Sequence, residues 1–124
     1  APNVVAMPRI GACTPESEDK CAVMASKAVY YYLTEGNIRN SVNLPNAELE
    51  RLGVCRLCVL HRNVPNMINS FLDLTGERNI NVEHMINKQK GEYAYTIIDL
   101  GEMIGPEITD RIKANKDVLR VRVL

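Results

Sequence analysis

The first regular pattern of apolar and polar positions along the chain is helical and runs from Thr14 to Gly36. Thr14 suits an N-cap and is followed by proline and glutamate, while Gly36 suits a left-handed C-terminal cap. Between them, apolar side chains recur at helical spacing at Cys21, Met24, Ala25, Ala28 and Tyr32. Because three consecutive tyrosines (30–32) cover most of the circumference, we expect this helix to pack against the rest of the chain or against a second chain.

The stretch that follows the helix, residues 37–53, has a different character. It is polar, contains Pro45, and shows neither the helical nor the strand period clearly. We interpret it as a linker.

From residue 54 onward the pattern of periods and turn residues becomes regular. It predicts a strand at 54–62, a helix that is entered by a turn at Asn63 and Pro65 and ends at Asn79, a strand at 80–87, a turn at 88–91, a strand at 92–100, a helix opened by Gly105-Pro106, and a strand at 119–124. This order predicts an α+β, ferredoxin-like βαββαβ domain. Its two crossovers place both helices on one face of a four-stranded antiparallel sheet.

The alternation within strand 54–62 divides its side chains between the two faces of that sheet. One face carries Cys55, Leu57, Val59 and His61, and the other carries Arg56. The face away from the helices also receives Arg120 or Arg122 and other polar positions. We expect it to be solvated or used for association.

Composition narrows the classes of function. The 124 residues leave room for one domain, or for one small domain with an appendage. Fifteen basic residues balance fifteen acidic ones, and there is one Phe and no Trp, so a nucleic-acid partner is not expected. No apolar run reaches the length of a membrane span and no signal peptide is present, so we expect a cytoplasmic protein with no membrane partner. The chain opens on Ala, within a strand-to-loop segment, which we interpret as part of a longer protein.

Two cysteines have the spacing of a metal knuckle, and His61 follows them. Cys55 and Cys58 lie within a predicted strand, however, and their side chains would point to opposite faces. Zinc needs ligands that converge on one point, so we expect buried, reduced thiols and no metal. His84, in the middle of the next strand, is read as a half-exposed strand residue.

The best candidate for a binding site is the first strand-to-helix turn. It combines free amides at a helix start, suited to a carboxylate, with asparagine side chains that both donate and accept hydrogen bonds. The candidate residues are His61, Asn63, Pro65, Asn66, Met67 and, at the start of the next strand, Asn81. The alternative is purely structural: Asn63 as a helix N-cap and Asn81 as a turn residue.

Three motifs, in order, resemble the D-3-phosphoglycerate dehydrogenase family. A-M-P-R-I-G-A-C-T (6–14) is similar to A-T-P-H-I-G-A-S-T of its substrate domain, and G-N-I-R-N-S-V-N-L-P (36–45) to its linker G-x-x-x-x-S-V-N-F-P. H-R-N-V-P-N (61–66), with N-I-N-V (79–82) after it, is similar to the H-x-N-x-P-G region of its ACT domain. The resemblance implies that 1–36 is the terminal loop and helix of a 2-hydroxyacid dehydrogenase substrate domain, 37–53 the linker and 54–124 an ACT regulatory domain.

The resemblance also implies a function. The parent would be an NAD-dependent oxidoreductase of L-serine biosynthesis, and L-serine or another amino acid would bind between two ACT domains as a feedback effector. The contacts would come from His61, Asn63, Asn66, Met67 and Asn81. The chain would be at least a dimer. The alternative is an oligomerisation domain that binds no effector.

Three positions depart from the family pattern. Asn66 and Asn79 replace glycines, and asparagine is the residue that best tolerates positive φ after glycine. Arg9 stands at the position of the catalytic histidine and cannot exchange a proton at neutral pH. Since no G-x-G-x-x-G follows a strand, we expect this chain alone to hold no dinucleotide site and no cofactor and to have no catalytic activity.

Overall fold

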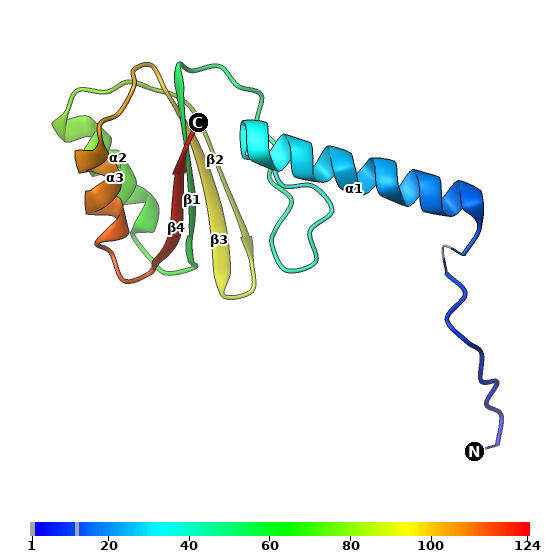
Figure 1. The fold of residues 1–124 in the computed structure, drawn as a ribbon. Helices are drawn as coiled ribbons and strands as arrows, with labels where there is room; N and C mark the ends of the chain where they lie inside the picture. The colour runs from blue at the N-terminus through cyan, green and yellow to red at the C-terminus, as the bar shows by residue number, and fades with distance from the viewer. Residues whose placement is uncertain (1, 12) are drawn as a thin grey trace.

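A computed structural model describes residues 2–11 and 13–124; Ala12, within the motif at 6–14, lies outside the described residues. The elements are α1 (Pro15–Glu35), β1 (Cys55–Arg62), α2 (Met67–Glu77), β2 (Val82–Lys90), β3 (Tyr93–Leu100), α3 (Pro106–Lys113) and β4 (Val118–Val123). The strands form one antiparallel sheet in the order β2-β3-β1-β4. Both α2 and α3 cover the same face of it (Figure 1). The ferredoxin-like βαββαβ prediction is confirmed.

The main core lies between the sheet and these two helices. Its buried members are Cys55, Leu57, Val59, Met67, Phe71, Ile98, Leu100, Ile108 and Ile112. Cys55 belongs to this core and Cys58 to the cluster on the other face. The two thiols therefore point to opposite faces, as the strand period predicts. No helix within residues 2–11 and 13–124 combines the length and the apolar content of a membrane span.

Asparagine replaces glycine at two turns of this domain and adopts the backbone that glycine would. Asn66 has a φ of 66° immediately before α2, and Asn79 has a φ of 55° just after it. The amide of Asn79 donates to the carbonyl of Gly76 at 3.1 Å, and that of Ile80 to Thr75 at 3.0 Å. The sequence-based expectation that both turns survive the substitution is confirmed.

The predicted turn at 88–91 is wrong. Residues 88–90 continue β2, where Lys88 pairs with Tyr95 and Lys90 with Tyr93, so only Gly91 and Glu92 form the turn. Gly91 adopts a φ of 62°. The sequence does not reveal this part of the strand, because Lys88, Gln89 and Lys90 are polar on both faces of an edge strand and show no alternation.

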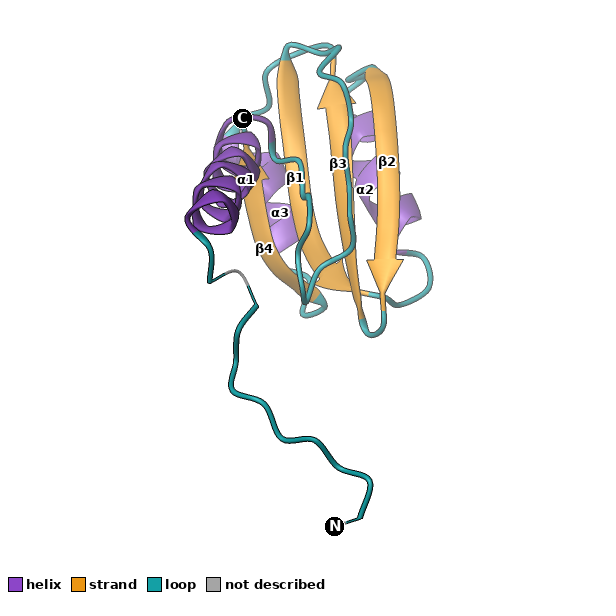
Figure 2. Ribbon diagram, turned by 90° about the vertical axis from the view of Figure 1, so that its right-hand side faces the viewer, coloured by secondary structure: helices purple, strands orange, loops and turns teal. Residues whose placement is uncertain are grey.

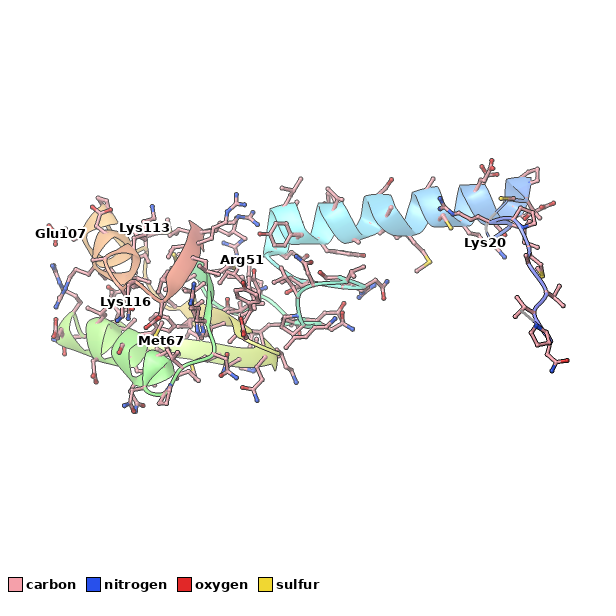
Figure 3. All side chains as sticks on the ribbon, turned by 90° about the horizontal axis from the view of Figure 1, so that it is seen from below. Lys20, Arg51, Met67, Glu107, Lys113 and Lys116 are labelled. Atoms are coloured by element: carbon pink, nitrogen blue, oxygen red, sulfur yellow. The ribbon has the colours of Figure 1, made fainter. Side chains whose placement is uncertain are left out.

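Helix α1 has the predicted ends. Thr14 accepts a hydrogen bond from the Ser17 amide at 3.2 Å, and Gly36 caps the other end with a φ of 71°. Only the last turn meets the sheet, where Arg122 stacks over the Tyr32 ring and donates to the carbonyls of Tyr32 and Leu33. No residue of α1 is buried, and the rest of the helix projects away from the sheet, with Lys20 far from it (Figures 1 and 3).

The middle of the second face of the sheet, on β1 and β3, is covered, which corrects the prediction of a solvated or associating surface there; on the edge strand β4, Arg120 remains exposed. Residues 37–53, here named the crossing segment, run over the face opposite α2 and α3 (Figure 2). Ile38 and Ala47 pair as an isolated bridge. They pack, with Leu49, onto a second buried cluster that contains Cys58, Tyr95 and Ile97. The segment predicted as a linker thus forms a third layer, which the sequence concealed because its three apolar anchors follow no period.

A buried ion pair joins the crossing segment to the sheet. Arg56 and Asp99, on neighbouring strands, form two hydrogen bonds of 2.6 and 2.8 Å, and both side chains are 0% exposed. Arg56 also donates to the Glu35 carbonyl and to Asn37, while Asp99 accepts from the Leu52 amide. Burial raises the pKa of the Asp99 carboxyl, but the hydrogen bonds from Arg56 and Leu52 outweigh it and hold that pKa below its usual range. The pair ties the end of α1 and both ends of the crossing segment to one point.

Candidate functional site

A polar hollow of about 210 Å³ lies at the turn between β1 and α2. Its lining residues are His61, Asn63, Val64, Asn66, Met67, Ile68, Asn69 and Asn87. Four of the predicted site residues, His61, Asn63, Asn66 and Met67, therefore come together. Pro65 lies in the same turn but is exposed and does not line the hollow.

The backbone around this turn explains its shape. The amide of Asn63 donates to Glu92 at 2.8 Å, which fixes the end of β1 against the hairpin. Asn66, with its left-handed backbone, then turns the chain into α2 and makes no side-chain cap, so the structural alternative of Asn63 as N-cap is wrong. The first-turn amides of α2, beginning at Met67, point out of the helix start as donors. Met67 itself lies at that start (Figure 3).

Asn81 does not join this hollow within one chain. Asn81 precedes β2, whereas Asn87 lies in the second half of that strand. At about 3.3 Å per residue, the two positions are about 20 Å apart along the strand. Its carbonyl accepts from the Gly101 amide, and its side chain donates to Glu83. A second chain is needed if Asn81 is to contact the same ligand.

The base of the hollow is formed by His61, which is 2% exposed and packs edge-on against Phe71. Its Nδ1 lies 2.8 Å from the Arg62 carbonyl and its Nε2 lies 2.8 Å from Thr96 Oγ1. Burial lowers the pKa of this imidazole, and the hydrogen bond with the Arg62 carbonyl offsets part of that effect. The ring is therefore neutral at pH 7.

Sequence reasoning missed Asn87 and Thr96. Thr96 Oγ1 lies 3.0 Å from the side-chain amide of Asn87, and the two residues pair across β2 and β3. A hairpin centred on Gly91 sets this register, so the wrong turn at 88–91 hid the pair. Had the short turn been predicted, the pairing would have placed Asn87 beside Thr96 and His61.

The hollow is suited chemically to a small zwitterion. Its lining offers amide donors at a helix start and asparagine side chains that both donate and accept, and no lining side chain carries a charge at pH 7. A carboxylate fits the helix start, while side-chain oxygens remain for an ammonium group. The segment before α1 runs far from the sheet (Figure 1). Arg9 belongs to that segment and is exposed, so it takes no part in the hollow.

The buried imidazole predicts a pH dependence of stability. Because the pKa of His61 is lower in the folded state than in the unfolded chain, the unfolded state takes up the proton first as pH falls. The free energy of unfolding should therefore be fully retained above about pH 6.5, and should fall by up to about 1.4 kcal/mol per pH unit below it. Urea unfolding at about pH 7.5 and about pH 5.5 measures this difference.

His61→Gln removes the titrating group, so the variant should lose this pH-dependent difference even where it lowers stability overall. His84→Gln is the matched control, because His84 is the protein's other histidine and is exposed. An equal difference in wild type and His61→Gln would contradict the assignment.

The chain is similar in sequence to known D-3-phosphoglycerate dehydrogenases. The chain is 32% identical to D-3-phosphoglycerate dehydrogenase 2 of Saccharomyces cerevisiae, over 88% of this chain and 24% of the relative. It is 26% identical to the D-3-phosphoglycerate dehydrogenase of Haemophilus influenzae, over 98% of this chain and 30% of the relative. The chain thus spans about a quarter of the length of these relatives.

Among solved structures, the crystal structure of the ACT domain from the GTP pyrophosphokinase of Chlorobium tepidum matches 56% of this chain and 95% of its own. That match has a TM-score of 0.42 and 12% identity. No protein-family model matches the chain. The resemblance carried by the three sequence motifs is confirmed over nearly the whole chain, which is a homologue of the C-terminal part of the D-3-phosphoglycerate dehydrogenases.

Proposed function

We propose that residues 54–124 are the amino-acid-binding ACT regulatory domain of an NAD-dependent D-3-phosphoglycerate dehydrogenase, and that L-serine binds its β1–α2 hollow as a feedback effector. The observation that carries the proposal is the convergence of His61, Asn63, Asn66 and Met67 on one uncharged polar hollow. The relatives' name supports the parent activity. Arg9 cannot act as its proton-transferring group, so catalysis in the parent would need another one.

The proposal includes a dimer in which the partner completes the hollow. β2 is an edge strand with free hydrogen-bonding groups along one side. If two copies pair through β2 around a two-fold axis at His84, Asn81 of one chain lies beside Asn87 of the other, because His84 is midway between them. Each hollow would then receive Asn81 from its partner. Feedback would require serine to bind differently in the two states of the parent's catalytic domains.

Calorimetric titration of the chain with L-serine tests the proposal. We expect saturable binding that Asn63→Ala or Asn81→Ala weakens at least about tenfold, because each removes a hydrogen bond to a charged group of the ligand. Asn46→Ala, on the far face of the sheet, is the control. Ligand at about 100 times its dissociation constant should also raise the free energy of unfolding by about 2.7 kcal/mol.

Mixing the two variants separates the sensor from the alternative, an oligomerisation domain without effector. In a mixed dimer of Asn63→Ala and Asn81→Ala chains, one hollow carries both defects and the other carries neither. Binding at wild-type affinity should therefore return at one site per mixed dimer. A dimer that binds no amino acid would favour the oligomerisation role, and a monomer that binds serine fully would contradict the shared site.

A further inference from the structure

A linked set of three polar side chains extends from the base of the hollow to its rim. His61 contacts Thr96 at 2.8 Å, and Thr96 contacts Asn87 at 3.0 Å. His61 and Thr96 are nearly fully buried, at 2% and 0% exposed, whereas Asn87 is exposed and lines the hollow. The hydrogen-bonding needs of the two buried residues, Thr96 and His61, therefore determine which way the Asn87 amide is oriented.

Counting protons along the set gives that orientation. The Arg62 carbonyl can only accept, so His61 Nδ1 carries the proton. In the neutral ring, Nε2 is then an acceptor, and the Thr96 hydroxyl must donate its single proton to it. The Asn87 atom that lies 3.0 Å from Thr96 Oγ1 in the structure is Oδ1, but Thr96 Oγ1 has no second proton to give to it. A carboxamide turned by about 180° fills the same space with its oxygen and nitrogen exchanged. We therefore assign the exchanged orientation, in which the Asn87 amide nitrogen donates to Thr96 Oγ1. The amide oxygen of Asn87 is consequently the atom turned away from Thr96.

We propose that Asn87 is a ligand-contacting residue of the hollow, with its amide oxygen accepting a hydrogen bond from the α-ammonium group of the bound amino acid. This inference rests on the proposed function and adds to it a residue that recognises the cationic end of the ligand. Another wall of the hollow is the start of α2, where Met67 and Ile68 present backbone amides. Donors on that wall suit the carboxylate, which leaves the ammonium for Asn87.

The test compares L-serine with L-glycerate, in which a neutral hydroxyl replaces the ammonium group. Asn87→Asp places a carboxylate beside the ammonium, so it should tighten L-serine binding at least about tenfold and weaken L-glycerate binding through repulsion. Asn87→Leu should weaken L-serine at least about tenfold and reduce its advantage over L-glycerate. The ratio of the two dissociation constants is the readout, since a purely structural role would change both ligands alike.

Gln89→Asp is the matched control. Gln89 lies on the same face of β2, two residues further along, and does not line the hollow. It introduces the same charge, and at physiological salt should change the ratio less than about threefold. Far-ultraviolet circular dichroism and melting temperature verify that each variant folds.

Two negative results have different meanings. If wild type binds no amino acid, the proposed function fails and this inference fails with it. If wild type binds L-serine but Asn87→Asp weakens that binding, or leaves the ratio unchanged, then Asn87 does not accept from the ammonium and the inference alone is overturned. A ¹⁵N spectrum that puts the His61 proton on Nε2 would also overturn it.

Discussion

Asp99→Ala should lower the free energy of unfolding by about 3–5 kcal/mol, the usual cost of removing one partner from a buried ion pair. The variant leaves the Arg56 guanidinium in a fully buried site with only the Glu35 carbonyl and Asn37 as partners. It also removes the acceptor of the Leu52 amide. Urea unfolding at neutral pH measures the loss.

The exposed ion pair between Arg39 and Glu48 provides the control for this prediction. Like the buried pair, it joins a carboxylate to a guanidinium, but its two side chains are 51% and 48% exposed. Because solvent screens this pair, Glu48→Ala should lower the free energy of unfolding far less than Asp99→Ala does. If the two variants cost the same, the buried pair does not carry the stability assigned to it.

The same pair predicts where the structure loosens. Arg56 and Asp99 hold Glu35, Asn37 and Leu52, which lie at the end of α1 and at both ends of the crossing segment. Amide hydrogen exchange in Asp99→Ala should therefore rise first in residues 37–53, while the β1–β3 ladder keeps its protection. Uniform acceleration across the domain would instead indicate global destabilisation only.

The order of elements could be predicted from the sequence because each element has its own hydrophobic period and its own capping or turn residues at its ends. Thr14 and Gly36 mark the ends of α1 by capping chemistry, and Asn79 marks the end of α2 by its tolerance of positive φ. These are local effects of a few neighbouring residues. The hollow could be predicted for the same reason, since His61, Asn63, Asn66 and Met67 all belong to one short turn.

What could not be predicted depends on contacts between distant residues. Nothing local to Arg56 shows that it pairs with Asp99, 43 positions away, and a strand arginine usually faces solvent. The cover over the second face depends on Ile38, Ala47 and Leu49, three anchors too few to form a period. Asn87 was not predicted as a site residue because the turn predicted at 88–91 gave the β2–β3 hairpin the wrong register. In each case tertiary pairing, rather than local propensity, decides the outcome.

Gly36→Ala should have the second large effect, lowering the free energy of unfolding by about 2–4 kcal/mol. Gly36 adopts a φ of 71°, where a side chain costs about 1 kcal/mol or more. A Cβ there would also approach Cys58 Sγ to less than a normal contact, and the Leu124 and Tyr95 side chains to 3.3 Å. Cys58 is 2% exposed within the second cluster and has little room to move, so overpacking adds to the backbone strain.

Two further variants divide this cost between its causes. Gly91 has a φ of 62° with nothing within 4 Å of an added Cβ, so Gly91→Ala measures backbone strain alone and should cost about 1 kcal/mol. In a Cys58→Ala background, Gly36→Ala should cost at least about 1 kcal/mol less than it does in wild type, because the clashing sulfur is gone. An unchanged cost in that background would mean that strain at the end of α1, and not its close contact with the sheet, makes glycine necessary there.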